Sequence, residues 1–193
     1  FIISSSNVLS IDLIESIIGF ETTIFVQLVF ALAIPDLYCY MVAFAPICLH
    51  TIKIIEKYFE EISCCIATSN FNQSSLVRDT ISDSNLRAKL NQALKEVTIE
   101  YGDATYRIER AEFIKQECSK TDISGLLHRL WPSLIYVSTA IGGSFAIYKE
   151  KLEFYCGKEL PLINMNFYIS SEGLFGSIAS IYTDEYILSP TSA

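Results

Sequence analysis

One long apolar run limits what this chain can fold into. Residues 24–49 (IFVQLVFALAIPDLYCYMVAFAPICL) contain one acidic residue and no basic residue, and a helix of this length could span a bilayer. Pro35-Asp36 interrupts the run, and Pro46 follows. One continuous helix is disfavoured, because a proline inside a helix removes a hydrogen bond and clashes with the preceding turn. No Lys or Arg precedes Lys53 to set an orientation across a membrane. The run is therefore predicted to form several buried elements of a globular core.

The interrupted run predicts an α/β pattern. The turn at its centre separates a helix that ends near Leu32 from a strand over residues 37–44. A second helix is predicted from Pro46, in its first turn, to Glu61. Residues 62–75 are then predicted to be a polar loop.

Residues 84–130 predict a helical insertion. Apolar residues recur at spacings of three and four between Ser84 and Val97, on one face of an amphipathic helix. Similar spacing predicts a second helix over residues 108–118 and a third over residues 123–131, with Asp122 near its start as a cap.

A βαβ unit is predicted after the insertion. A strand over residues 134–140 leads to Gly142-Gly143, a helix over 145–155 that Gly157 stops, and a strand over 160–167. Ligand sites in parallel sheets lie beyond the carboxyl ends of the strands. The two places of interest are thus the turn at residues 142–144 and the segment from Tyr168 onward.

Composition excludes several classes of protein. With 51% hydrophobic and 19% charged residues the chain is not disordered, and a net charge of -8 argues against a broad nucleic-acid-binding surface. The six cysteines contain no CxxC pair, which disfavours a structural zinc site. Reduced core thiols in a cytoplasmic protein are the favoured interpretation.

The segment Tyr168–Gly176 (YISSEGLFG) combines residue types that bind ligands. A tyrosine ring stacks on a base, hydroxyl groups donate to phosphate or carboxylate oxygens, and a carboxylate holds Mg²⁺. A polar turn with a solvated Glu172 explains the same residues equally well.

The stretch from Trp131 to Gly176 resembles the auxin-responsive acyl acid-amido synthetases, the family named for the Gretchen Hagen genes. The matching residues, in order, are Trp131-Pro132, Tyr136, Gly143, Tyr148, residues 152–155 with Gly157, Pro161-Leu162 and YISSEGLFG at 168–176. Residues 20–120 resemble the middle region of that family by their order of elements.

The resemblance implies the fold and the reaction. Residues 1–193 would be part of the large N-terminal domain of an adenylate-forming enzyme, with a parallel sheet flanked by helices and the helical insertion near residues 84–130. The implied enzyme is an ATP-dependent ligase that activates a small carboxylic acid as acyl-AMP and conjugates it to an amino acid. It would use ATP and Mg²⁺, have no nucleic-acid or membrane partner, and be cytoplasmic.

Site residues follow from the same resemblance. Tyr168 would lie against adenine, Ser171 would contact the α-phosphate or the acyl carboxylate, and Glu172 would orient Mg²⁺ with ATP. Ser171 and Glu172 are thus the implied catalytic residues, and Ser170 is a further candidate for nucleotide binding. Gly143 and Ser144 match the turn that borders the nucleotide and acyl pocket, although strand-to-helix geometry explains them equally well.

One motif of the family has no match. Ser4-Ser5-Ser6-Asn7 lacks the glycine of a phosphate-gripping loop, so this loop is expected to be absent from residues 1–193. By the same resemblance, the small C-terminal domain is expected to lie outside residues 1–193. The chain alone is therefore expected to be inactive. Two alternatives are a degenerate, non-catalytic module of the same fold and a protein anchored in a membrane through residues 24–49.

Overall fold

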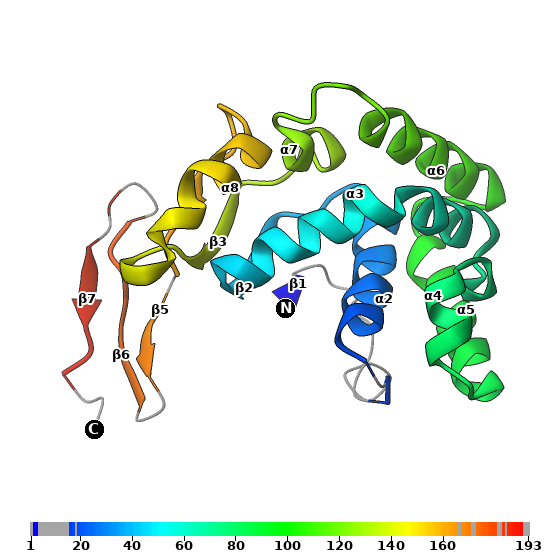
Figure 1. The fold of residues 1–193 in the computed structure, drawn as a ribbon, viewed down its shortest axis with the longest axis horizontal. Helices are drawn as coiled ribbons and strands as arrows, with labels where there is room; N and C mark the ends of the chain where they lie inside the picture. The colour runs from blue at the N-terminus through cyan, green and yellow to red at the C-terminus, as the bar shows by residue number, and fades with distance from the viewer. Residues whose placement is uncertain are drawn as a thin grey trace.

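The computed structural model describes residues 2–3, 16–17, 19–165, 167–170, 173–180, 183 and 185–190. They form a four-stranded sheet in the order β1-β2-β3-β4 and a separate three-stranded sheet in the order β5-β6-β7 (Figure 1). The strands are β1 (Ile2–Ile3), β2 (Cys39–Phe44), β3 (Tyr136–Ala140), β4 (Leu162–Ile163), β5 (Phe167–Ser170), β6 (Gly173–Ile178) and β7 (Tyr186–Leu188). The α-helices are α2 (Phe20–Ala33), α3 (Ala45–Thr68), α4 (Ser75–Thr80), α5 (Ser84–Thr98), α6 (Ala104–Cys118), α7 (Leu126–Leu130) and α8 (Lys149–Cys156). The 3-10 helices are η1 (Phe71–Gln73) and η2 (Gly143–Tyr148).

The first sheet confirms the α/β prediction. Strand β3 pairs in parallel with β2 and with β4, and the short β1 adds an antiparallel edge beside β2. Cys39 lies opposite Tyr136, and Val137 lies opposite Leu162. Helices α5, α6 and α7 occupy the predicted insertion over residues 84–130, and they follow α3 and α4 in the chain between β2 and β3.

The apolar run is divided as the prolines predict. It forms the buried α2, then β2, then the start of α3, and Phe25 of α2 packs edge-on against Tyr58 of α3 with ring centroids 5.8 Å apart. Ten residues of α2 are buried, and each large apolar side chain removed from water contributes about 1.5–3 kcal/mol. Among the described residues, no helix has both the length and the apolar character needed to cross a bilayer.

Side chains from the helical insertion cover the carbonyl end of α2. Arg110 of α6 is only 7% exposed and donates to the carbonyl oxygens of Leu32 at 2.8 Å, Ile34 at 3.2 Å and Leu130 at 2.9 Å. Two further side chains donate to carbonyl oxygens at this helix end. Tyr106 Oη donates to the Ala33 carbonyl at 2.8 Å, and Trp131 Nε1 donates to the Ala31 carbonyl at 3.0 Å. Carbonyl groups at a helix end carry partial negative charge, so a cation is favourable there. Burial lowers the pKa of Arg110 to about 10, which leaves it charged at neutral pH.

The predicted polar loop over residues 62–75 is wrong over its first half. Ile62, Cys65 and Ile66 are fully buried and continue the apolar face of α3 at helical spacing, so the helix runs to Thr68. Ser69 then adopts the left-handed conformation, with φ 47°, and ends the helix. Helices η1 and α4 follow, within and just beyond the predicted loop.

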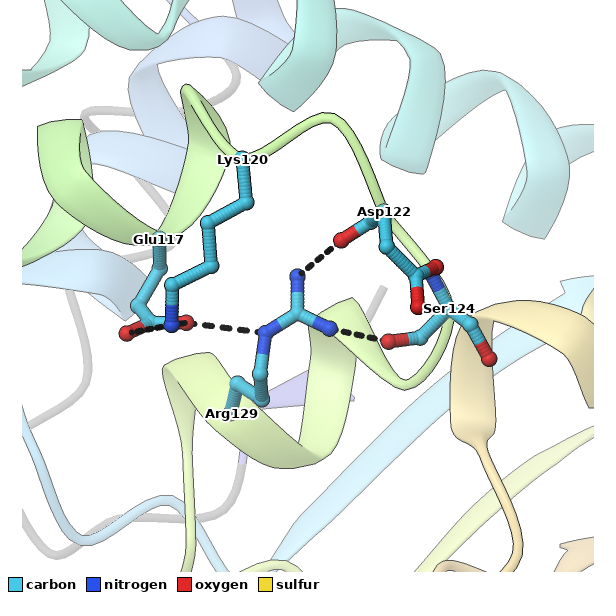
Figure 2. A network of polar contacts seen from close by, with 5 residues as sticks. All are labelled: Glu117, Lys120, Asp122, Ser124 and Arg129. Atoms are coloured by element: carbon cyan, nitrogen blue, oxygen red, sulfur yellow. Dashed lines mark hydrogen bonds and ion pairs between the residues drawn. The ribbon is translucent and has the colours of Figure 1, made fainter.

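Arg129 fixes the linker between α6 and α7 (Figure 2). Its Nε donates to Glu117 at 2.8 Å, and its other two nitrogens donate to the carbonyl oxygens of Asp122, at 3.2 Å, and Ser124. Lys120 also contacts the Glu117 carboxylate, at 2.6 and 2.7 Å. The Asp122 side chain accepts from the Ser124 N–H at 2.8 Å, while α7 itself begins after Gly125. The third predicted helix is therefore shorter than expected, because this linker occupies its first residues.

The region after β3 differs from the prediction in two elements. The helix expected over residues 145–155 consists of η2 followed by α8, and Gly157, with φ 79°, ends it as predicted. The strand expected over residues 160–167 is wrong, because the parallel strand β4 covers Leu162–Ile163 only. A second, antiparallel sheet begins at Phe167.

The six cysteines are free thiols, as predicted, but not all of them lie in the core. Cys39, Cys48, Cys65 and Cys156 are buried, Cys118 is partly buried and Cys64 is exposed. Burial raises the pKa of Cys65 and Cys156 to about 12. These thiols are protonated at neutral pH and act as small apolar core residues.

Candidate functional site

Three parallel strands end at one edge of the first sheet. β2 ends at Phe44, β3 at Ala140 and β4 at Ile163, and their parallel pairing brings these carboxyl ends together. The rings of Phe44 and Phe145 lie 5.6 Å apart, so the end of β2 also contacts η2. In open α/β sheets this edge is where ligands bind.

The turn after β3 exposes its backbone. Gly142, Gly143 and Ser144 are all exposed, and Gly143 has a φ of 57°, which disfavours residues with a side chain. A Cβ added at Gly143 would meet no atom within 4 Å. The φ angle alone accounts for glycine at this position, and the open space is what the approach of a ligand to the backbone requires.

Asn164 joins this turn to the end of β4. Its Oδ1 accepts from the N–H of Ile141 at 3.2 Å and from the N–H of Met165 at 3.0 Å. Its own carbonyl accepts from Ser138 Oγ at 3.4 Å. One partly buried side chain therefore sets the position of the backbone after two neighbouring strands.

Tyr168 lies inside strand β5, although the sequence placed it just after a parallel strand. Its side chain is 54% exposed, and its ring centroid lies 5.8 Å from those of both Phe175 and Tyr186. Tyr186 Oη donates to the Met165 carbonyl at 2.8 Å. Tyr168 is thus connected to the strand-end edge through Tyr186 and Met165, with part of its ring open to solvent.

The other predicted site residues are described in part or not at all. Ser170 is the last residue of β5, where it pairs with Gly173, and Ser144 belongs to η2. Ser171 and Glu172 lie outside the described residues. No group of three or more His, Cys, Asp or Glu side chains able to hold a metal ion occurs within the described part of the chain.

Asn164 is the residue of this edge that sequence reasoning missed. The run LPLINMNF reads as one apolar strand, but it contains two asparagines, at 164 and 166. Asparagine is depleted in strands and favours turns because its side chain bonds to nearby backbone groups. The two asparagines would therefore have predicted a strand that ends at Ile163.

Comparisons with known proteins identify the chain by sequence. Residues 3–162 match the profile of the GH3 family N-terminal domain. The indole-3-acetic acid-amido synthetase GH3.17 of Arabidopsis thaliana is 33% identical over 133 residues, which cover 69% of this chain and 19% of that protein. The 4-substituted benzoates-glutamate ligase GH3.12 of the same plant is 39% identical over 70 residues, or 36% of this chain and 12% of that protein. The chain spans about a fifth of the length of the first of these relatives.

Solved structures agree in fold. The GH3.15 acyl acid amido synthetase superposes with a TM-score of 0.72 and 28% identity, over 91% of this chain and 30% of that one. A complex of AtGH3.15 with 2,4-DB gives a TM-score of 0.65 and 32% identity, over 81% of this chain and 25% of that one. By its sequence and its fold, this chain belongs to the GH3 family.

Proposed function

We propose that this chain is part of the N-terminal domain of an acyl acid-amido synthetase, which activates a small carboxylic acid with ATP as acyl-AMP and conjugates it to an amino acid. The observation that carries the proposal is the match to the GH3 N-terminal domain over residues 3–162. The open turn at residues 142–144, at the shared carboxyl edge of three strands, supports it.

The substrate class follows from the relatives and from the surroundings of the turn. Two relatives are named for indole-3-acetic acid and for 4-substituted benzoates with glutamate, and both acids join an apolar ring to a carboxylate. Phe44, 47% exposed, and the adjoining Phe145 offer an apolar surface beside the turn. We therefore propose an aromatic or similarly apolar carboxylic acid as the acyl substrate.

Tyr168 is suited to bind the adenine base. Contacts with Phe175 and Tyr186 hold its ring, while its 54% exposure leaves surface on which a base can stack. Ser170 and Ser171 would donate to phosphate or carboxylate oxygens, and Glu172 would hold Mg²⁺, which prefers oxygen ligands. An ion held there would neutralise phosphate charge, and the reaction would need no protein nucleophile.

The protein's contribution is positioning. Attack of a carboxylate oxygen on the α-phosphate, with release of pyrophosphate, is accelerated when both groups are held in reacting geometry and the developing charge is compensated. Two parts of the site are held in place for this purpose. Asn164 fixes the turn after β3, and Phe175 and Tyr186 fix the ring of Tyr168. Residues 1–193 alone are proposed to be inactive, because Ser4–Asn7 lacks the glycine of a phosphate-gripping loop.

Acid-dependent ATP–pyrophosphate exchange tests the proposal. The full polypeptide that contains residues 1–193 is assayed with indole-3-acetate and a panel of benzoates. Glu172→Ala should reduce the exchange rate about a hundredfold, whereas Glu109→Ala, at an exposed position of α6, should retain the wild-type rate. An unchanged rate in Glu172→Ala would disprove the role of that residue. Absence of exchange with every acid would favour the non-catalytic module.

A further inference from the structure

We propose that Asn164 is a ligand-binding residue, whose Nδ2 donates a hydrogen bond to a negatively charged oxygen of the bound substrate. This inference rests on the proposed function, because it assumes that the strand-end edge binds the acid and the nucleotide. It adds a donor that the resemblance to the family did not supply.

The hydrogen bonds of Asn164 fix which end of its amide is which. Both groups that approach Oδ1, the N–H of Ile141 and the N–H of Met165, are donors. The accepting atom is therefore the oxygen, and the other end is the NH₂ group with its two donors. Because the two N–H groups come from different strand ends, the amide plane is held in place before any ligand arrives.

The NH₂ group lies at the turn. A Cβ added at Gly142 would lie 3.5 Å from Asn164 Nδ2, and Gly142 and Gly143 are exposed. Within the described part of the chain, the hydrogen bonds of the Asn164 side chain involve its oxygen. The nitrogen is thus a donor with a fixed direction beside the exposed backbone of Gly142.

The chemistry of the ligand follows from this donor. A hydrogen bond to an ionised acceptor is stronger than one to a neutral acceptor. The proposed reaction brings two such acceptors together, the substrate carboxylate and the α-phosphate. Asn164 would bind one of these oxygens while its Oδ1 holds the turn.

Two substitutions separate donation from the structural role. Asn164→Asp keeps oxygens that accept from Ile141 and Met165 but replaces the donor with a second acceptor that bears negative charge. Gly142→Ala leaves Asn164 intact and places a methyl group over its nitrogen. The φ of -85° and ψ of 167° at Gly142 are accessible to alanine, so this variant should fold even if the first does not.

The experiment measures equilibrium binding to the full polypeptide and to both variants. AMP is compared with adenosine, and indole-3-acetate with indole-3-acetamide, so that each anion has a neutral partner of similar shape. The measurements are made in about 0.5 M NaCl, where screening limits charge effects to a few ångströms. Thermal unfolding of each variant checks that the fold is retained.

We expect both variants to bind one of the two anions about tenfold more weakly, with its neutral partner unaffected. Loss for AMP would identify the phosphate as the acceptor, and loss for indole-3-acetate would identify the carboxylate. Unchanged affinity for both anions in either folded variant would overturn the assignment of Asn164 alone. Failure of the wild-type polypeptide to bind any of the four compounds would overturn the proposed function, and this assignment with it.

Discussion

Two fully buried threonines differ in what their hydroxyl groups contact. Thr51 Oγ1 donates to the Cys48 carbonyl at 2.7 Å and lies 2.5 Å from Tyr40 Oη. Thr139 Oγ1, in β3, is buried without a hydrogen-bond partner in the described structure. A buried polar atom without a partner loses its bonds to water and receives none in return.

Thr139→Val should therefore stabilise the protein by about 1 kcal/mol, because valine has nearly the same shape and no hydroxyl. Thr51→Val is the matched control and should destabilise it by about 1–2 kcal/mol, because it leaves Tyr40 without that partner. Urea unfolding of both variants at neutral pH measures the difference. Equal destabilisation by the two substitutions would show that Thr139 has a partner.

Single residues show where sequence reasoning stops. Trp131 is fully buried, and its ring centroid lies 5.9 Å from that of Tyr40. The burial of Arg110 had no sequence signal, because the carbonyl groups that it contacts on Leu32 and Ile34 lie 78 and 76 residues away. Local spacing predicts which face of a helix is apolar, but it does not reveal a distant carbonyl group.

At the scale of elements, the contact between Glu117 and Arg129 joins α6 to α7 across their linker. Burial alone would raise the pKa of Glu117, but hydrogen bonds from Lys120 and Arg129 outweigh it and lower the pKa below 4.5. A carboxyl group with a lower pKa in the folded state stabilises the protein above its unfolded pKa. This contribution is lost as the pH falls through the lower, folded value.

Glu117→Gln should lower the free energy of unfolding by about 1–2 kcal/mol at pH 7, and the difference from the wild type should shrink as the pH falls below 4.5. Glu112→Gln is the control, since Glu112 contacts Lys115 with a side chain that is 57% exposed. Exposed pairs contribute about 0–1 kcal/mol. Urea unfolding at a series of pH values makes the comparison. A Glu117→Gln difference that stayed constant down to pH 3 would contradict the ionic origin of the effect.

Helices whose apolar residues recur at regular spacing over several turns were predicted well. Leu86, Leu90 and Leu94 are buried on one face of α5, and the helix bounds differ from the prediction by one residue. The errors fall where the apolar pattern is short or is interrupted by polar residues. Ile62, Cys65 and Ile66 sit among polar residues and were assigned to a loop, whereas the two residues of β4 were extended into a strand of eight.

At the scale of the whole molecule, the candidate site depends on strand order, which the sequence supplied only in part. The βαβ pattern predicted that ligands would bind after β3 and β4, and the parallel pairing of these strands is confirmed. The second sheet was not predicted, because its strand pairing is antiparallel and its first strand follows Asn164 after a short connection. The contact of Tyr168 with Tyr186 is a consequence of that sheet.

A ligand that joins these strand ends should stabilise the whole fold. If only the folded state binds Mg-ATP, a concentration about a hundredfold above Kd raises the free energy of unfolding by about 2.7 kcal/mol. Tyr168→Leu removes the aromatic face and should weaken binding about tenfold, whereas Tyr168→Phe keeps the ring and should preserve the effect. Thermal unfolding of the full polypeptide, with and without Mg-ATP, gives the shift in Tm for each variant. An equal shift in Tyr168→Leu and wild type would place the base elsewhere. A wild-type protein without any shift would be the non-catalytic module, because that alternative keeps the sheet while lacking nucleotide binding.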